Sequence, residues 1–104
     1  MVDLAIKKKW EVTEVLLSRA RGHLLPTLGD AGKEQDPRLQ QCDEYLAHNE
    51  LELAMEVLAD IGAEHQCRGG FWRDLERAAK IMELSERSVQ FRANFHEALQ
   101  NQQS

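Results

Sequence analysis

The sequence predicts an all-α fold, a single-domain bundle of about five helices over residues 1–104. Leu, Ala, Glu, Gln and Arg are abundant, whereas the β-branched residues Val, Ile and Thr are too scarce to build a sheet. Two prolines and six glycines divide the chain, and apolar residues recur at helical spacing between them. A chain of 104 residues supports one hydrophobic core, so we expect no second domain.

The first helix is expected between Asp3, a typical N-cap residue, and Gly22, a typical stop. Its apolar residues spread over more than half of the helical surface, which predicts a central position in the bundle. They are Leu4, Ala5, Ile6, Trp10, Val12, Val15, Leu16, Leu17 and Ala20. Lys8, Lys9 and Arg19 fall near this surface, and we expect their stems to cover it while their charges stay in water.

Residues 22–36 are expected to form a long connection. Pro26, Gly29 and Gly32 interrupt this stretch, which lacks a helical period of useful length. Loops of more than about 12 residues are uncommon in compact domains, and those that occur are often functional. We expect the leucines of this stretch to pin it across the bundle; they are Leu24, Leu25 and Leu28.

Asp36 followed by Pro37 predicts the start of a second helix. The pair supplies an N-cap acceptor and a proline at a position where no backbone donor is needed. This helix is expected to end near His48. Its inward stripe consists of Leu39, Cys42, Tyr45 and Leu46.

A third helix is expected after Asn49, a good N-cap residue. Its inward stripe consists of Leu51, Ala54, Met55, Leu58 and Ile61, and Leu53 and Val57 widen it. Gly62 or the Gly69-Gly70 pair ends this helix, and we include Glu64 in its last turn.

Two further helices complete the predicted bundle. The fourth carries Phe71, Trp72, Leu75, Ala78, Ala79 and Met82 on one narrow face, and we expect Trp72, like Trp10, to be a core residue. Glu76 and Lys80 form a favourable i, i+4 pair in this helix. Ser85 caps the fifth helix, whose expected core residues are Val89, Phe91, Ala93, Phe95 and Leu99. Residues 100–104 are expected to fray.

Negative charge is concentrated in the middle of the chain. Residues 1–29 carry a net charge of +2, residues 30–64 carry −8 and residues 65–104 carry +1. The middle segment repels nucleic acid and anionic membranes, so we expect neither to be its direct ligand. A basic protein partner is favoured.

Four carboxylates in this segment follow one another at i, i+4 spacing on the third helix, and no Lys or Arg lies between them; they are Glu52, Glu56, Asp60 and Glu64. Like charges at this spacing destabilise an isolated helix by roughly 0.2–0.5 kcal/mol per pair. The fourth helix balances its charges, which makes general solubility a poorer explanation for the ladder. We therefore predict that the four carboxylates, with Asp43 and Glu44, bind a surface rich in Lys and Arg.

No catalytic motif is present in the sequence. It lacks a glycine-rich phosphate loop, a GxSxG elbow, an HExxH motif and a CxxC motif. Cys42, His48, His65 and Cys67 do not have the spacing of a common zinc site, and no Glu-x-x-His motif supports a di-metal site. We therefore expect no enzyme activity, no metal and no cofactor.

The cysteines and the N-terminus predict a cytoplasmic location. Two cysteines without dense spacing suit a reducing cytosol in which both thiols stay free, with a disulfide between Cys42 and Cys67 as the alternative. The N-terminal lysines follow a very short apolar stretch, unlike those of a signal peptide. No run reaches the roughly 18 apolar residues of a membrane-spanning helix.

The stretch EYLAHNELELAMEVLADIGAE, from Glu44 to Glu64, resembles the EYLEHNE-x-x-LALE-x-L pattern of small bacterial immunity proteins. These are the Maf-type immunity proteins and related proteins of contact-dependent growth inhibition loci. Ala47 and Met55 stand where that pattern has Glu and Leu. The resemblance implies a cytoplasmic antitoxin that binds its cognate toxin domain, commonly a nuclease.

The charge pattern and the resemblance together give the hypothesis of a toxin-neutralising immunity protein. Its acidic helix would occupy a basic cleft that is built for phosphates. The connection over residues 22–35 is a second candidate binding face. The alternative is an acidic helical adaptor or regulatory protein that binds a basic housekeeping protein, and an enzyme is the third reading.

Overall fold

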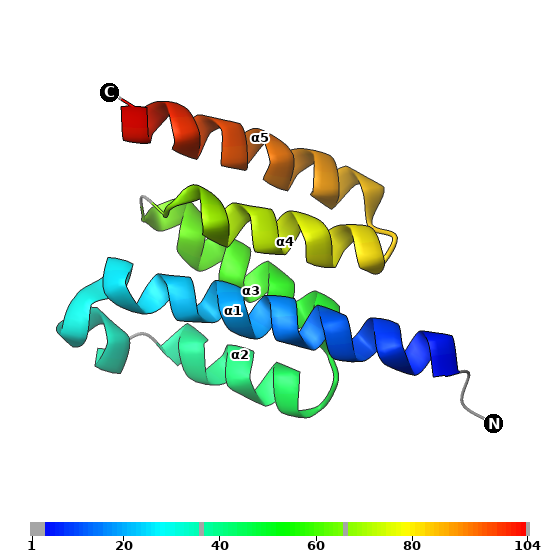
Figure 1. Cartoon of the computed structure of the whole chain (residues 1–104). Coiled ribbons are helices and arrows are strands. Elements are labelled where there is room, and N and C mark those ends of the chain that lie inside the picture. The colour runs from blue at the N-terminus through cyan, green and yellow to red at the C-terminus, as the bar shows by residue number, and fades with distance from the viewer. Residues whose placement is uncertain (1–3, 36, 66, 104) are drawn as a thin grey trace.

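The structure, a computed structural model, describes the backbone of residues 4–35, 37–65 and 67–103, and the side chains of residues 7–24, 37–65 and 67–100. It contains α1 (Leu4–Gln35), α2 (Pro37–Ala47), α3 (Leu51–Glu64), α4 (Gly69–Ile81) and α5 (Ser85–Gln103) (Figure 1). No strand occurs in these described ranges. The prediction of an all-α bundle of about five helices is therefore confirmed.

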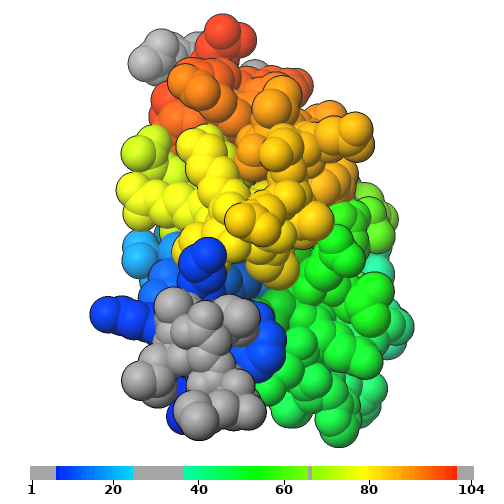
Figure 2. Space-filling view, turned by 90° about the vertical axis from the view of Figure 1, so that its right-hand side faces the viewer, coloured from blue at the N-terminus to red at the C-terminus, as the bar shows by residue number. Residues whose placement is uncertain are grey.

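The five helices form a flat slab with α1 in its middle. α1 packs against α4, α3 and α2, while α2 packs on α3 and α5 packs on α4. In Figure 1, α4 and α5 lie on one side of α1, α2 lies on the other, and α3 passes behind it. The Cα atoms span 50 × 29 × 17 Å. Figure 2 shows the end of the slab at which α1 begins, where the last turn of α4 meets the start of α1.

The predicted connection over residues 22–36 is wrong, because α1 continues as one helix to Gln35. Pro26 has no backbone N–H. The carbonyl of Gly22, four residues earlier, therefore lacks the hydrogen bond that a helix normally supplies. Gly22 is exposed, and apart from the backbone of its own helix no described atom lies within 4 Å of the position that its Cβ would take. Water can therefore reach that carbonyl, and the helix tolerates the proline. Leu24 is fully buried, whereas Leu25 and Leu28 lie outside the residues whose side chains are described.

The core lies where α1, α3 and α4 meet, and it contains most of the predicted inward residues. Its largest fully buried apolar side chains are Phe71, Phe91, Leu17, Leu24, Met55, Leu58, Ile61, Leu75 and Cys42. Trp72 is buried, as expected, and its ring stacks on Phe91 at a centroid distance of 6.1 Å. The two aromatic rings join α4 to α5.

Several predicted core residues are exposed instead. Trp10 is 49% exposed and Val89 is 69% exposed, and Val12, Val15 and Leu99 also reach solvent. The side chain of Ala93 is exposed as well. The reason is that, within the described ranges, α5 packs against α4 alone and α1 is covered on only part of its circumference. An apolar helix face is buried only where a neighbouring helix covers it.

Other helix ends also differ from the prediction; Ser85, for example, is the first residue of α5 rather than its cap. Asn49 does not cap α3; it adopts a left-handed φ of 56° in the turn, and Glu50 directly precedes the helix. Gly62 lies inside α3, which ends at Glu64, so the inclusion of Glu64 is confirmed. α5 continues to Gln103, so residues 100–103 belong to a helix rather than to a frayed tail.

Candidate functional site

The predicted binding carboxylates of α3 lie on the helix surface that points away from the core. Leu51, Ala54, Met55, Leu58 and Ile61 are buried on the opposite side of the same helix. Glu52, Asp60 and Glu64 are exposed and Glu56 is half-buried. Leu53, which was expected to widen the inward stripe, is 46% exposed and therefore belongs to this outward surface. We call the surface formed by Glu52, Leu53, Glu56, Asp60 and Glu64 the acidic face.

Glu56 is bound by an arginine from another helix. Arg87 of α5 donates from Nε to Oε1 at 2.7 Å and from Nη2 to Oε2 at 2.6 Å. The Arg87 guanidinium also lies over the ring of Phe91, 4.8 Å from its centroid. Two parallel hydrogen bonds and an aromatic support hold this arginine in a fixed position. The pair ties α3 to α5, two helices that do not pack directly against each other in the described part of the chain.

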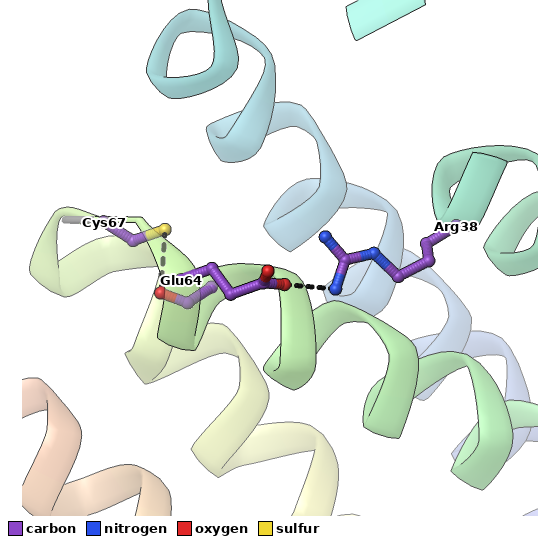
Figure 3. A network of polar contacts seen from close by, with 4 residues as sticks. Arg38, Glu64 and Cys67 are labelled. Atoms are coloured by element: carbon purple, nitrogen blue, oxygen red, sulfur yellow. Dashed lines mark hydrogen bonds and ion pairs between the residues drawn. The ribbon is translucent and has the colours of Figure 1, made fainter. Parts of the chain in front are cut away.

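Glu64 and Asp43 are also bound by arginines. Arg38 of α2 donates from Nη1 to Oε2 of Glu64, as Figure 3 shows. The Nε of Arg21 of α1 lies 2.7 Å from Oδ1 of Asp43, and its Nη2 donates to Oδ2 at 3.0 Å. Each of these pairs joins two helices and is partly exposed to water.

The inference that no basic residue balances the acidic ladder is therefore wrong for Glu56 and Glu64. Their counterions come from positions 31 and 26 residues away in the chain, so inspection of α3 alone could not find them. Among the residues whose side chains are described, Glu44, Glu52 and Asp60 make no hydrogen bond or ion pair through their side chains. The six predicted carboxylates thus divide into three that are paired and three that are free.

A second charged cluster, which the sequence did not reveal, lies between α1 and α4. Asp74 is almost fully buried, and its Oδ2 lies 3.5 Å from Nε2 of His23 and 3.8 Å from Nε of Arg19. That oxygen makes no hydrogen bond within the described part of the chain. Asp74 follows Phe71 by three residues and precedes Ala78 by four, so its helical spacing places it beside the buried face. This helical spacing was the signal in the sequence that could have identified Asp74 as a residue beside the core.

The two cysteines are free, buried thiols. Burial raises the pKa of the Cys42 thiol to about 11, and the neighbouring Asp43 carboxylate acts in the same direction. Burial raises the pKa of the Cys67 thiol to about 11 as well. Figure 3 shows Cys67 directed at the carbonyl oxygen of Gly62, which lies 3.8 Å from its Sγ. Both thiols are protonated at neutral pH, so neither is a prepared nucleophile or metal ligand.

The described residues contain no group of three or more His, Cys, Asp or Glu side chains that could hold a metal ion. None of the helices, as far as they are described, is long and apolar enough to cross a membrane.

Comparison with protein-family models, with curated proteins and with solved structures gives no match.

Proposed function

We propose that this protein is an immunity protein that binds and neutralises a cognate toxin domain, a basic nuclease, through the acidic face. The observation that carries the proposal is an exposed leucine on the same side of α3 as Glu52 and Asp60, two carboxylates without a counterion among the described side chains. Leu53 lies two helical turns before Asp60 on one side of α3, and Glu52 precedes it directly. Interfaces combine such an apolar anchor with charges that steer the partner.

The paired and the free carboxylates have different roles in this proposal. The bonds of Glu56 to Arg87 and of Glu64 to Arg38 hold α3 against the neighbouring helices. A carboxylate that is already bound to a guanidinium contributes little field at a distance. Glu52, Asp60 and the nearby Glu44 keep their full charge and attract the lysines and arginines of a phosphate-binding cleft. The resemblance of residues 44–64 to immunity proteins supports the same partner class.

The test takes as candidate partners the basic nuclease domains encoded by genes next to this one, each produced in a catalytically inactive form. We expect binding that weakens as the salt concentration rises, and protection of cells that express the active domain. The variant Glu52→Lys with Asp60→Lys should weaken binding by at least about tenfold, which corresponds to about 1.4 kcal/mol. Leu53→Ala should lower the affinity without changing the salt dependence.

The matched control is Glu86→Lys with Glu97→Lys on α5. Both residues are exposed, and the change in net charge equals that of the acidic-face variant. The control should bind and protect like the wild type. Equal binding and equal salt dependence of the control and the acidic-face variant would remove the acidic face from the interface. Failure of the wild type to bind and to protect would refute the function itself.

A further inference from the structure

A groove of about 370 Å³ lies between the first part of α1 and the end of α4. It is lined by Lys8, Lys9 and Val12 from α1, and by Lys80, Ile81 and Glu83 from α4 and the turn that follows it. Figure 2 shows these two segments in contact at the end of the slab. Three ammonium groups and one carboxylate thus surround a floor of Val12 and Ile81. We call this the basic groove.

The surface around the basic groove continues both its charge and its apolar character. Arg77 is exposed and lies one turn before Lys80 and Ile81 on α4. Val15, which is 57% exposed, lies one turn after Val12 on α1. Lys80 is paired with Glu76 at 3.0 Å, which confirms the predicted i, i+4 pair. In the described part of the chain, the side chains of Lys8, Lys9 and Arg77 make no ion pair.

The chemistry of this surface fits an acidic protein surface better than a nucleic acid. A phosphate backbone makes no use of the aliphatic side chains of Val12, Val15 and Ile81, which protein interfaces bury. The net charge of −5 also opposes the approach of a polyanion to the molecule as a whole. A suitable partner supplies apolar contacts for the aliphatic side chains and carboxylates for the basic ones. A helix that presents aliphatic side chains among carboxylates supplies both.

The protein itself carries such a helix in the acidic face of α3. Glu52 and Asp60 are eight residues apart, about 12 Å along the helix, and Leu53 is exposed on the same side. Lys8 and Val15 span about 10 Å along α1, so the two surfaces have similar lengths. The acidic face points away from the core and therefore away from its own α1. Only a second copy can bring the two surfaces together.

We propose that the basic groove binds the acidic face of a second copy of this chain. Leu53 of one copy packs on Val12 and Ile81 of the other, and its free carboxylates approach the unpaired Lys8 and Arg77. Stable interfaces bury about 1,200–2,000 Å² of accessible surface. The contact between this groove and one face of a helix would bury less surface than that. The association should therefore be weak, in the micromolar range, and sensitive to salt. The proposal does not rest on the function proposed above, because it concerns the protein alone.

Sedimentation velocity over a micromolar concentration series measures this association. We expect concentration-dependent self-association at about 0.05 M NaCl that is lost at about 0.5 M, where the Debye length falls below about 5 Å. The groove variant Lys8→Glu with Arg77→Glu and the face variant Glu52→Lys with Asp60→Lys should each weaken it by more than about tenfold, because like charges then meet across the interface. An equimolar mixture of the two variants should associate again, because each supplies the surface that the other lacks.

The controls reverse the same number of charges elsewhere. Arg68→Glu with Arg92→Glu matches the groove variant, and Glu86→Lys with Glu97→Lys matches the face variant; all four residues are exposed. Both controls should associate like the wild type. A wild type that remains monomeric throughout, variants that associate normally, or a mixture that stays monomeric would each overturn the proposal. Loss of binding to single-stranded RNA in the groove variant, with no self-association of the wild type, would instead assign the groove to nucleic acid.

Discussion

Two glycines inside helices provide a test of the packing between α3 and α4, because the same substitution should act in opposite directions. A Cβ added at Gly62 would lie 2.3 Å from Cε1 and 2.7 Å from Cζ of Phe71, and 3.2 Å from a ring carbon of Trp72. Ordinary contacts between carbon atoms lie at about 3.5–4.0 Å. Phe71 is fully buried, so a movement of its ring must displace other core side chains.

The expected magnitude for Gly62→Ala follows from two opposing effects. Overpacking of a core costs about 1–3 kcal/mol. Replacing glycine by alanine inside a helix raises the free energy of unfolding by about 0.5–1 kcal/mol. The free energy of unfolding should therefore fall, by up to about 2.5 kcal/mol. For a domain of this size, each kcal/mol lowers Tm by about 4–8 °C.

Gly22→Ala is the matched control, because the same methyl group is added inside α1 where, apart from the backbone of the helix itself, no described atom lies within 4 Å. Its free energy of unfolding should rise by about 0.5–1 kcal/mol. Urea unfolding followed by circular dichroism measures both variants. Stabilisation by Gly62→Ala as large as that by Gly22→Ala would refute the close approach of Phe71 to α3. In a Phe71→Leu background the penalty at Gly62 should shrink, because leucine lacks the ring atoms that clash.

Three further predictions concern the two tryptophans, one ion pair and one cysteine. Trp72→Ala should lower the free energy of unfolding by about 3–5 kcal/mol, whereas Trp10→Ala should cost less than about 1 kcal/mol, as measured by urea unfolding. A double-mutant cycle on Glu56→Gln and Arg87→Met should give a coupling of about 0.5–1 kcal/mol that falls with salt. Cys67, with its pKa raised to about 11, should resist alkylation at pH 8 in the folded protein. Its contribution to stability is complete below pH 9 and is lost as the pH rises toward 11, because only the unfolded thiol ionises in that range; pH-dependent urea titration tests this.

The helices and most of the core could be predicted because their signals are local. Apolar residues at i, i+3 and i+4 identify the buried stripe of α3 and α4 within a few turns, without knowledge of the neighbours. The same reasoning failed at Trp10 and Val89, because an apolar residue is buried only where another helix covers it. It failed at Gly22 and Pro26 because the backbone carbonyl that loses its donor to the proline belongs to the exposed Gly22, so the helix can continue to Gln35 without burying an unpaired polar group.

The sequence by itself determined the all-α fold, the inward stripes, the local Glu76–Lys80 pair and the concentration of negative charge in the middle of the chain. Each of these depends on residues within one or two helical turns, or on composition alone. Only the tertiary structure decided which carboxylates of the ladder remain free. Arg87 reaches Glu56 across 31 residues and Arg38 reaches Glu64 across 26. Such pairs depend on how the helices pack against one another, and no periodicity within a single helix encodes that arrangement.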